Sequence, residues 1–73
     1  MATTAPTVRV TVNGSERELP AGRTIAQALE LLGLDPRLVV VEHNRVILPR
    51  ERVGEVEVRA GDNLEIVHFV GGG

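Results

Sequence analysis

A single stretch of this chain, residues 24–32, has the hydrophobic spacing of an α-helix, which limits the folds that the chain can adopt. The i, i+3, i+4, i+7 pattern of one helical face is followed by Ile25, Ala28, Leu29 and Leu32. Thr24 and Gln27 fit a capping box at the start, and Gly33 stands where helix ends favour a left-handed residue. One short helix covers one face of a small sheet, so the remaining segments are expected to supply that sheet.

The segments on both sides of this helix have the patterns of short strands. Residues 7–12 alternate, with valines on one face, and the Asn13-Gly14 that follows is typical of a type I′ hairpin turn. We expect further strands at residues 16–19, 38–42, 46–48 and 64–69, a helical or irregular turn at 50–54, and a brief extended piece around Val56 and Val58. The expected fold is an α+β domain in two layers, a β-grasp roll with one main helix on a four- to five-stranded mixed sheet. The strand order does not follow from these patterns.

Composition excludes several kinds of site and partner. The chain has no cysteine, so it has no disulfide, thiolate metal site or thiol nucleophile. His43 and His68 are not spaced as a metal pair. A net charge of −2, with no basic run and with Phe69 as the only aromatic residue, argues against binding to nucleic acid. We find no nucleophile beside a base, no phosphate-binding glycine loop and no catalytic carboxylate pair, so the chain is not expected to be an enzyme.

The ends of the chain carry no targeting signal that we can identify. Residues 1–7 have neither the basic flank nor the apolar core of a signal peptide, and no stretch is long enough to span a membrane. We therefore expect a cytoplasmic protein without a membrane partner. The expected organisation is a flexible N-terminal tail at residues 1–7, one domain at residues 8–70 and a flexible glycine tail at residues 71–73.

The glycine tail is the most informative functional feature. Gly71, Gly72 and Gly73 follow directly on the apolar strand 64–70, with no serine, proline or charged spacer between them. Glycine has no side chain to pack, so these residues add nothing to a core. A strand that leads straight into a slim terminal carboxylate is typical of a segment presented to a partner. A frayed end or a cut linker is the alternative explanation of the tripeptide alone.

Several segments together resemble the ThiS family, the sulfur carriers of thiazole formation in thiamin biosynthesis. The resemblance covers residues 8–73 and is carried by residues 12–14, 22–25 with Leu29 and Leu32, 39–44, 47–51, Gly61-Asp62 and, most specifically, 65–73. It implies the ubiquitin-like β-grasp fold and a carrier that binds no cofactor of its own. It also implies three partners: a ThiF-like adenylyltransferase that uses Mg-ATP, a cysteine desulfurase as the indirect sulfur donor, and a ThiG-like thiazole synthase.

The resemblance assigns roles to the tail, and strand parity suggests where partners bind. Gly73 would carry the adenylated and then thiocarboxylated group, while Gly71 and Gly72 thread into the partner. If Leu64 and Ile66 face the core, then Val67 and Phe69 face outward beside the tail and, with Val70, form a docking patch. Phe69 as a cap on the end of the core is the other possibility.

Five polar residues have no assigned function in this scheme. His68 receives no catalytic role, and a structural role in a turn is the favoured interpretation of Glu42 and Asn44. Arg50 and Glu51, which follow Pro49, form either a surface ion pair or a partner contact.

Three other functions are compatible with this sequence. The small subunit of molybdopterin synthase has the same fold and activation, although its tail usually ends in two glycines and enters a different enzyme. A ubiquitin-like protein modifier would be joined to lysines of its targets, and this chain has no lysine on which to build chains. An adaptor domain with an inert glycine end would show no ATP-dependent change at Gly73.

Overall fold

The computed structural model describes residues 6–69, and residues 1–5 and 70–73 lie outside the described part. The elements within it are β1 (Thr7–Val12), β2 (Ser15–Pro20), α1 (Ile25–Leu31), the 3₁₀ turn η1 (Pro36–Leu38), β3 (Val39–His43), β4 (Val46–Leu48), the 3₁₀ turn η2 (Arg50–Arg52) and β5 (Asn63–His68). This agrees with the predicted succession of a hairpin, one helix and three further strands. The expected flexible tails fall largely on residues that are not described, and β1 begins at Thr7.

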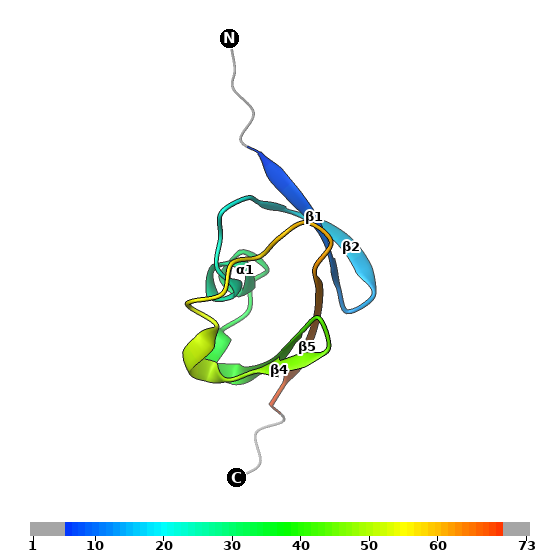
Figure 1. The fold of residues 1–73 in the computed structure, drawn as a ribbon. Coiled ribbons are helices and arrows are strands. Elements are labelled where there is room, and N and C mark those ends of the chain that lie inside the picture. Colours follow the sequence, from blue (N-terminus) through cyan, green and yellow to red (C-terminus); the bar gives the residue numbers. More distant parts are fainter. Residues whose placement is uncertain (1–5, 70–73) are drawn as a thin grey trace.

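The strands form one mixed five-stranded sheet in the order β2-β1-β5-β3-β4. β5, the last strand in the sequence, lies in the middle, parallel to β1 and antiparallel to β3. β2 and β4 are the two edges, and each is paired antiparallel with the strand that directly precedes it in the chain. Figure 1 shows α1 lying across one face of this curved sheet. The predicted α+β fold of one helix on a mixed sheet is therefore confirmed.

The core lies between α1 and the inward face of the sheet. Ile25, Ala28 and Leu29 of the helix are completely buried, as the predicted helical stripe requires. They belong to one cluster with alternate residues of the strands, among them Val10, Val12, Val41, Leu64 and Ile66. Every buried hydrophobic residue in the described part is aliphatic or alanine. A core of this kind depends on close packing, because no large ring fills its centre.

The helix starts and stops where its sequence signals predict. The Thr24 hydroxyl accepts a hydrogen bond from the Gln27 amide at 3.2 Å, and the Gln27 side chain accepts one from the Thr24 amide at 2.9 Å. Gly33 adopts a φ of +80°, and the amide of Leu34 then bonds the Leu29 carbonyl at 2.9 Å. Both helix ends therefore satisfy backbone groups that the helix itself leaves free.

Two segments differ in detail from the sequence-based prediction. Leu38 belongs to η1 rather than to the following strand, because the Asp35 side chain caps a short turn that begins at Pro36. The extended piece around residues 56–58 is a single bridge between Glu57 and Thr24 and adds no strand to the sheet. Its Val58 is nevertheless 1% exposed, so the segment closes the core beside the helix start.

Candidate functional site

The candidate site is the C-terminal end of β5, the strand that leads into the glycine tail. β5 is held by backbone pairing on both sides: residues 39–43 of β3 pair with residues 64–68, and residues 11–12 of β1 pair with residues 63–64. The ladder continues one residue beyond the strand, because the Phe69 amide donates to the Leu38 carbonyl at 2.9 Å. The chain is therefore anchored to the sheet up to Phe69, the last residue described.

The side chain of Asn13 takes the place of a missing section of β1 beside β5. β1 ends at Val12, and the chain turns at Asn13 with a φ of +48°. The Asn13 side-chain amide then donates to the Ile66 carbonyl at 3.1 Å and accepts from the Ile66 amide at 2.7 Å. One side chain thus reproduces the hydrogen bonds of a neighbouring strand and holds β5 at Ile66, five positions before Gly71.

Strand parity at β5 is as the sequence predicts. Leu64 and Ile66 are 0% and 7% exposed and face the core, whereas Val67 and Phe69 are 65% and 54% exposed. Phe69 also borders a groove of about 200 Å³, whose lining includes Val40, Ile47 and Arg50 as well as the core valines Val39, Val41 and Val53. The exposure of Phe69 favours the outward position, but Phe69 also borders the groove beside the core residues Val39 and Val41, so neither alternative is decided. Its role in docking stays a prediction, and Val70, Gly71, Gly72 and Gly73 lie outside the described residues.

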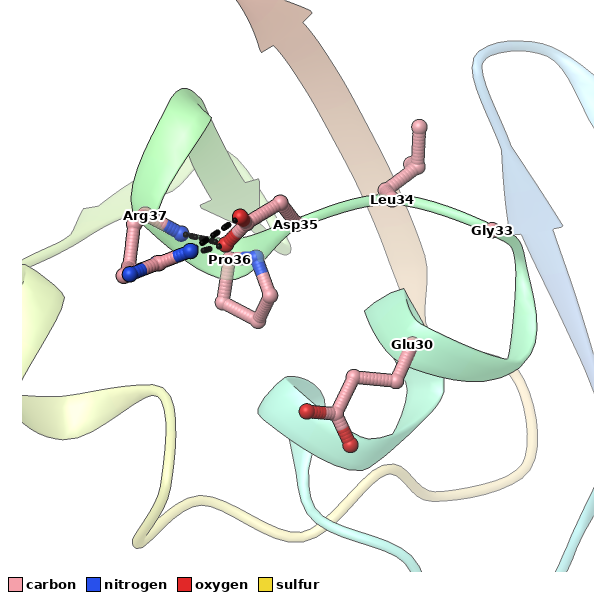
Figure 2. Close-up of a pocket in the computed structure, with 6 residues that line it drawn as sticks. All are labelled: Glu30, Gly33, Leu34, Asp35, Pro36 and Arg37. Carbon is pink, nitrogen blue, oxygen red and sulfur yellow. Dashed lines mark hydrogen bonds and ion pairs between the residues drawn. The ribbon is translucent and has the colours of Figure 1, made fainter.

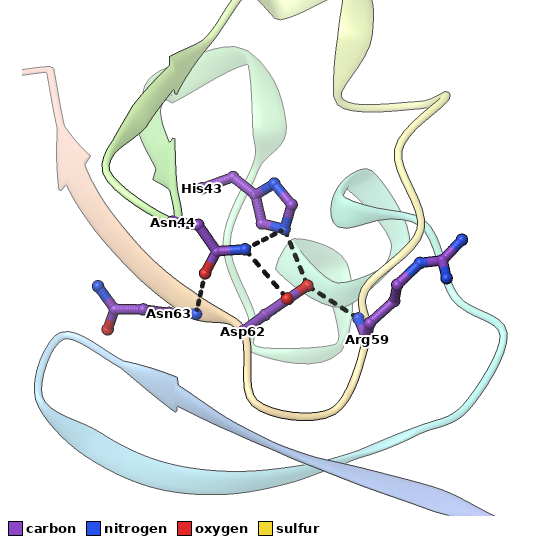
Figure 3. A network of polar contacts seen from close by, with 5 residues as sticks. All are labelled: His43, Asn44, Arg59, Asp62 and Asn63. Carbon is purple, nitrogen blue, oxygen red and sulfur yellow. Dashed lines mark hydrogen bonds and ion pairs between the residues drawn. The ribbon is translucent and has the colours of Figure 1, made fainter.

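A polar network holds the opposite end of β5 (Figure 3). The Asp62 carboxylate, which is 8% exposed, accepts hydrogen bonds from His43 Nε2 at 2.8 Å, Asn44 Nδ2 at 3.1 Å and the Arg59 amide at 2.8 Å. The side-chain oxygen of Asn44 accepts from the Asn63 amide at 2.8 Å. These bonds tie the β3–β4 turn to the turn before β5, so Asn44 fits the structural interpretation made from the sequence.

The hydrogen bonds of this network outweigh the cost of burying the carboxylate. Burial is the largest single influence and raises the pKa of Asp62, but the bonds from Arg59, His43 and Asn44 together hold that pKa below its ordinary value. Sequence reasoning missed this network because its members are up to 19 residues apart. Gly61-Asp62 contributes to the family resemblance, but the burial of the Asp62 carboxylate is visible only in the fold.

Arg50 does not form the surface ion pair with Glu51 that the sequence left open. The four ion pairs within the described residues are Arg9–Glu18, Asp35–Arg37, His43–Asp62 and Arg52–Glu55. The Arg50 guanidinium instead donates to the Arg37 carbonyl at 3.1 Å, next to the residue that bonds Phe69. The other alternative for Arg50, a contact with a partner protein, stays a prediction.

A second hollow, between the end of α1 and η1, offers no chemistry of its own (Figure 2). Its charged groups are Glu30, Asp35 and Arg37, and the last two bind one another at 2.8 Å. This contact lowers the pKa of Asp35 to about 2. Across residues 6–69 no three histidine, aspartate or glutamate side chains gather as metal ligands would, and no helix there is long and apolar enough to cross a membrane.

The fold and its presented end define a ubiquitin-like β-grasp domain, in which one helix packs on a mixed sheet and the last strand occupies the centre. The family model that describes the ThiS family matches residues 10–73. The chain belongs to the ThiS family. It is 48% identical over 50 residues to the sulfur carrier protein ThiS of Bacillus subtilis, which covers 68% of this chain and 76% of that protein.

Two other comparisons bear on the fold and on longer relatives. The crystal structure of the thiamine biosynthesis protein ThiS from Geobacter metallireducens superposes with a TM-score of 0.77 at 30% identity, over 90% of this chain and 100% of that one. A thiazole synthase of Paramagnetospirillum magneticum is 44% identical over 66 residues, which is 90% of this chain. A thiazole synthase of Magnetococcus marinus is 36% identical over the same length. The chain spans about one fifth of the length of these two relatives.

Proposed function

We propose that the chain is a sulfur carrier of thiamin biosynthesis and that the carboxylate of Gly73 carries the sulfur. The observation that supports this most directly is the position of the glycines, which follow a central strand that is paired with β1 at its start and with β3 up to Phe69. Membership of the ThiS family supports the same conclusion. On this proposal the chain is a carrier that other enzymes act on and not itself an enzyme.

The proposed chemistry begins with the poor reactivity of a carboxylate. Its charge repels nucleophiles and its oxygen is a bad leaving group. Attack of the Gly73 carboxylate on the α-phosphate of Mg-ATP releases pyrophosphate and leaves an acyl-adenylate on the chain. The terminal sulfur of a persulfide then attacks the acyl carbon and AMP leaves. A second thiol cleaves the resulting S–S bond, which leaves a thiocarboxylate on Gly73 and a disulfide on the donor.

The glycines suit the first of these steps for a steric reason. The activating enzyme has to bring the carboxylate to near-attack distance of a phosphate inside a channel. Gly71 and Gly72 have no Cβ, so their backbone passes where any other residue would collide. The chain binds no cofactor of its own in this scheme, and Mg-ATP is used by the activating partner.

Three partners follow from this scheme. A ThiF-like adenylyltransferase would activate Gly73, a cysteine desulfurase would supply the persulfide indirectly, and a ThiG-like thiazole synthase would accept the sulfur. The names of the two longer relatives support the thiazole synthase, because each contains a segment similar to most of this chain. Val67, Phe69 and Val70 are the proposed docking residues, and the exposure of the first two supports this assignment.

The decisive experiment for the pathway is discharge of the loaded carrier. The chain with a thiocarboxylate on Gly73 is incubated in parallel with a thiazole synthase and with the large subunit of molybdopterin synthase, each with its other substrates. We expect the thiazole synthase to return the tail to a carboxylate and to incorporate the sulfur. Discharge by the pterin enzyme alone would contradict the thiazole assignment and leave the carrier chemistry intact.

A further inference from the structure

Two carboxylates of like charge face one another across the central strands of the sheet. The register of β3 and β5 pairs Glu42 directly with Glu65. Their neighbours Val41 and Ile66 also pair, and both of these are buried against the helix. Because side chains alternate along a strand, Glu42 and Glu65 project from the opposite face, which α1 does not cover. Like charges directly opposite one another destabilise a sheet.

Neither carboxylate is neutralised within the part of the chain that the structure describes. The four ion pairs of residues 6–69 involve other acidic side chains. On the next strand Glu42 is paired with Ile47, which is 64% exposed and offers no charge. The sheet therefore places two paired glutamates, neither of them in an ion pair among the described residues, on the face that α1 does not cover.

This acidic pair adjoins an apolar surface that leads to the tail. Two residues further along the same face, Val40 of β3 pairs with Val67 of β5. Phe69 follows and borders the same groove as Val40 and Ile47. We call these four residues, Val40, Ile47, Val67 and Phe69, the apolar patch. Carboxylates thus lie at one end of the patch, and the chain toward Gly71 leaves from the other.

We propose that Glu42 and Glu65 are the charged anchor by which the chain docks on its thiazole synthase, with an arginine or lysine of that enzyme bound between the two carboxylates. The inference rests on the proposed function and names a recognition element for it. A cation in this position would remove the repulsion across the strands, while the apolar patch packs against the enzyme and the tail enters its site. The surface would therefore be less stable alone than in the complex.

Two observations favour the thiazole synthase as the partner: the charge of this surface, and the presence of a similar segment within longer thiazole synthase chains. A chain of net charge −2 in which a half-buried Glu42 lies opposite an exposed Glu65 is complementary to a basic surface and not to an acidic one. The relatives at 44% and 36% identity carry their similar segment within a single thiazole synthase chain. Within one chain, the segment is held near the rest of the enzyme at a high effective concentration, which favours contact between the two.

The test is the double variant Glu42→Gln/Glu65→Gln, which keeps side-chain shape and removes both charges. Its matched control is Glu30→Gln/Glu57→Gln, which removes the same charge from exposed positions on α1 and beside Thr24. We expect the first variant to melt at a temperature equal to or above that of the wild type. We expect its Kd for the thiazole synthase to rise at least about tenfold and to depend less on salt. The control should bind as the wild type does.

The possible outcomes separate this inference from the proposed function. Equal binding by the Glu42→Gln/Glu65→Gln variant and the wild type, with wild-type carrier discharged normally, would overturn the anchor alone. A lower melting temperature of that variant would also overturn it, because the pair would then stabilise the fold. Loss of adenylation in place of synthase binding would assign the surface to the activating enzyme and contradict the inference. Failure of the wild type to be loaded or discharged would instead contradict the proposed function.

Discussion

The side-chain amide of Asn13 is hydrogen-bonded to both backbone groups of Ile66, at 2.7 and 3.1 Å. These residues are 53 positions apart in the sequence. The contact lets the β1–β2 turn bind the strand that carries the tail, although β1 itself has already ended. β5 lies in the centre of the sheet, and the Asn13 side chain binds it at Ile66. Together these two features explain why β5 stays hydrogen-bonded close to its C-terminal end.

Substitution of Asn13 by glycine should lower the free energy of unfolding by about 1–3 kcal/mol. Glycine tolerates the φ of +48° at this position, so the loss reports the two partly buried hydrogen bonds and not backbone strain. Urea denaturation measures the effect, and amide hydrogen exchange at Ile66 should become faster. A destabilisation below about 0.5 kcal/mol, the scatter of ordinary surface changes, would mean that the clamp contributes nothing measurable.

The Asp62 network should make the fold sensitive to acid. The pKa of Asp62 in the folded chain is lowered below the unfolded value of about 3.9. A group of this kind stabilises the fold above its unfolded pKa, and that contribution is lost as the pH falls through the lower, folded pKa. We therefore expect the melting temperature of the wild type to fall as the pH is lowered from about 5 to below the folded pKa.

The matched variants for this test are Asp62→Asn and Asp35→Asn. The pKa of Asp35 is also lowered, to about 2, but its pair with Arg37 is exposed. Exposed pairs add little stability, so Asp35→Asn should leave the acid dependence almost unchanged. Asp62→Asn should be less stable at neutral pH and should flatten the dependence. Parallel curves for the wild type and Asp62→Asn would show that this carboxylate is not the acid-sensitive group.

The docking role of Val67 is tested by a pair of equally exposed valines. Val67 and Val46 are both 65% exposed, and Val46 lies on β4 outside the apolar patch. Val67→Ser should weaken binding to the thiazole synthase about tenfold or more, as truncation at the centre of an interface does. Val46→Ser should leave binding unchanged, and both variants should have similar stability. Equal affinities for the two variants would remove Val67 from the docking surface.

Alanine at Gly72 or Gly73 should abolish adenylation while the fold survives. A Cβ in a narrow channel displaces the carboxylate from the phosphate, and small displacements cost about a hundredfold in rate. Gly54→Ala is the control, because a Cβ there meets no atom within 4 Å and the residue does not need a positive φ. Pyrophosphate release measures the rate and circular dichroism the fold. Folded tail variants with near wild-type rates would contradict the proposed role of the glycines.

Local signals in the sequence predicted the elements well. The helix between Thr24 and Gly33 agrees in its caps and its buried stripe, since capping and periodicity are set by neighbouring residues. The exposure of Val67 and Phe69 also followed from simple alternation along one strand. Leu38 was placed wrongly in a strand, because the Asp35 cap and Pro36 impose a 3₁₀ turn that the apolar run concealed.

What the sequence did not show depends on contacts between distant residues. The strand order, the Asn13–Ile66 clamp and the burial of Asp62 each require knowledge of which segments become neighbours. Glu42 was interpreted as a turn residue, although it lies in β3 with Glu65 opposite. Only the register of β3 against β5 reveals that pairing, because in the sequence either glutamate alone resembles an ordinary polar strand residue.

The central claim, that Gly73 carries sulfur, is tested most directly by intact mass. The purified chain is incubated with Mg-ATP, the adenylyltransferase and a persulfide donor, and the product is fragmented to locate any change. We expect a mass gain that matches one oxygen replaced by sulfur, located on Gly73. An unchanged mass, with the tail intact and the same enzyme active on another carrier, would contradict it and leave the glycines as an inert terminus.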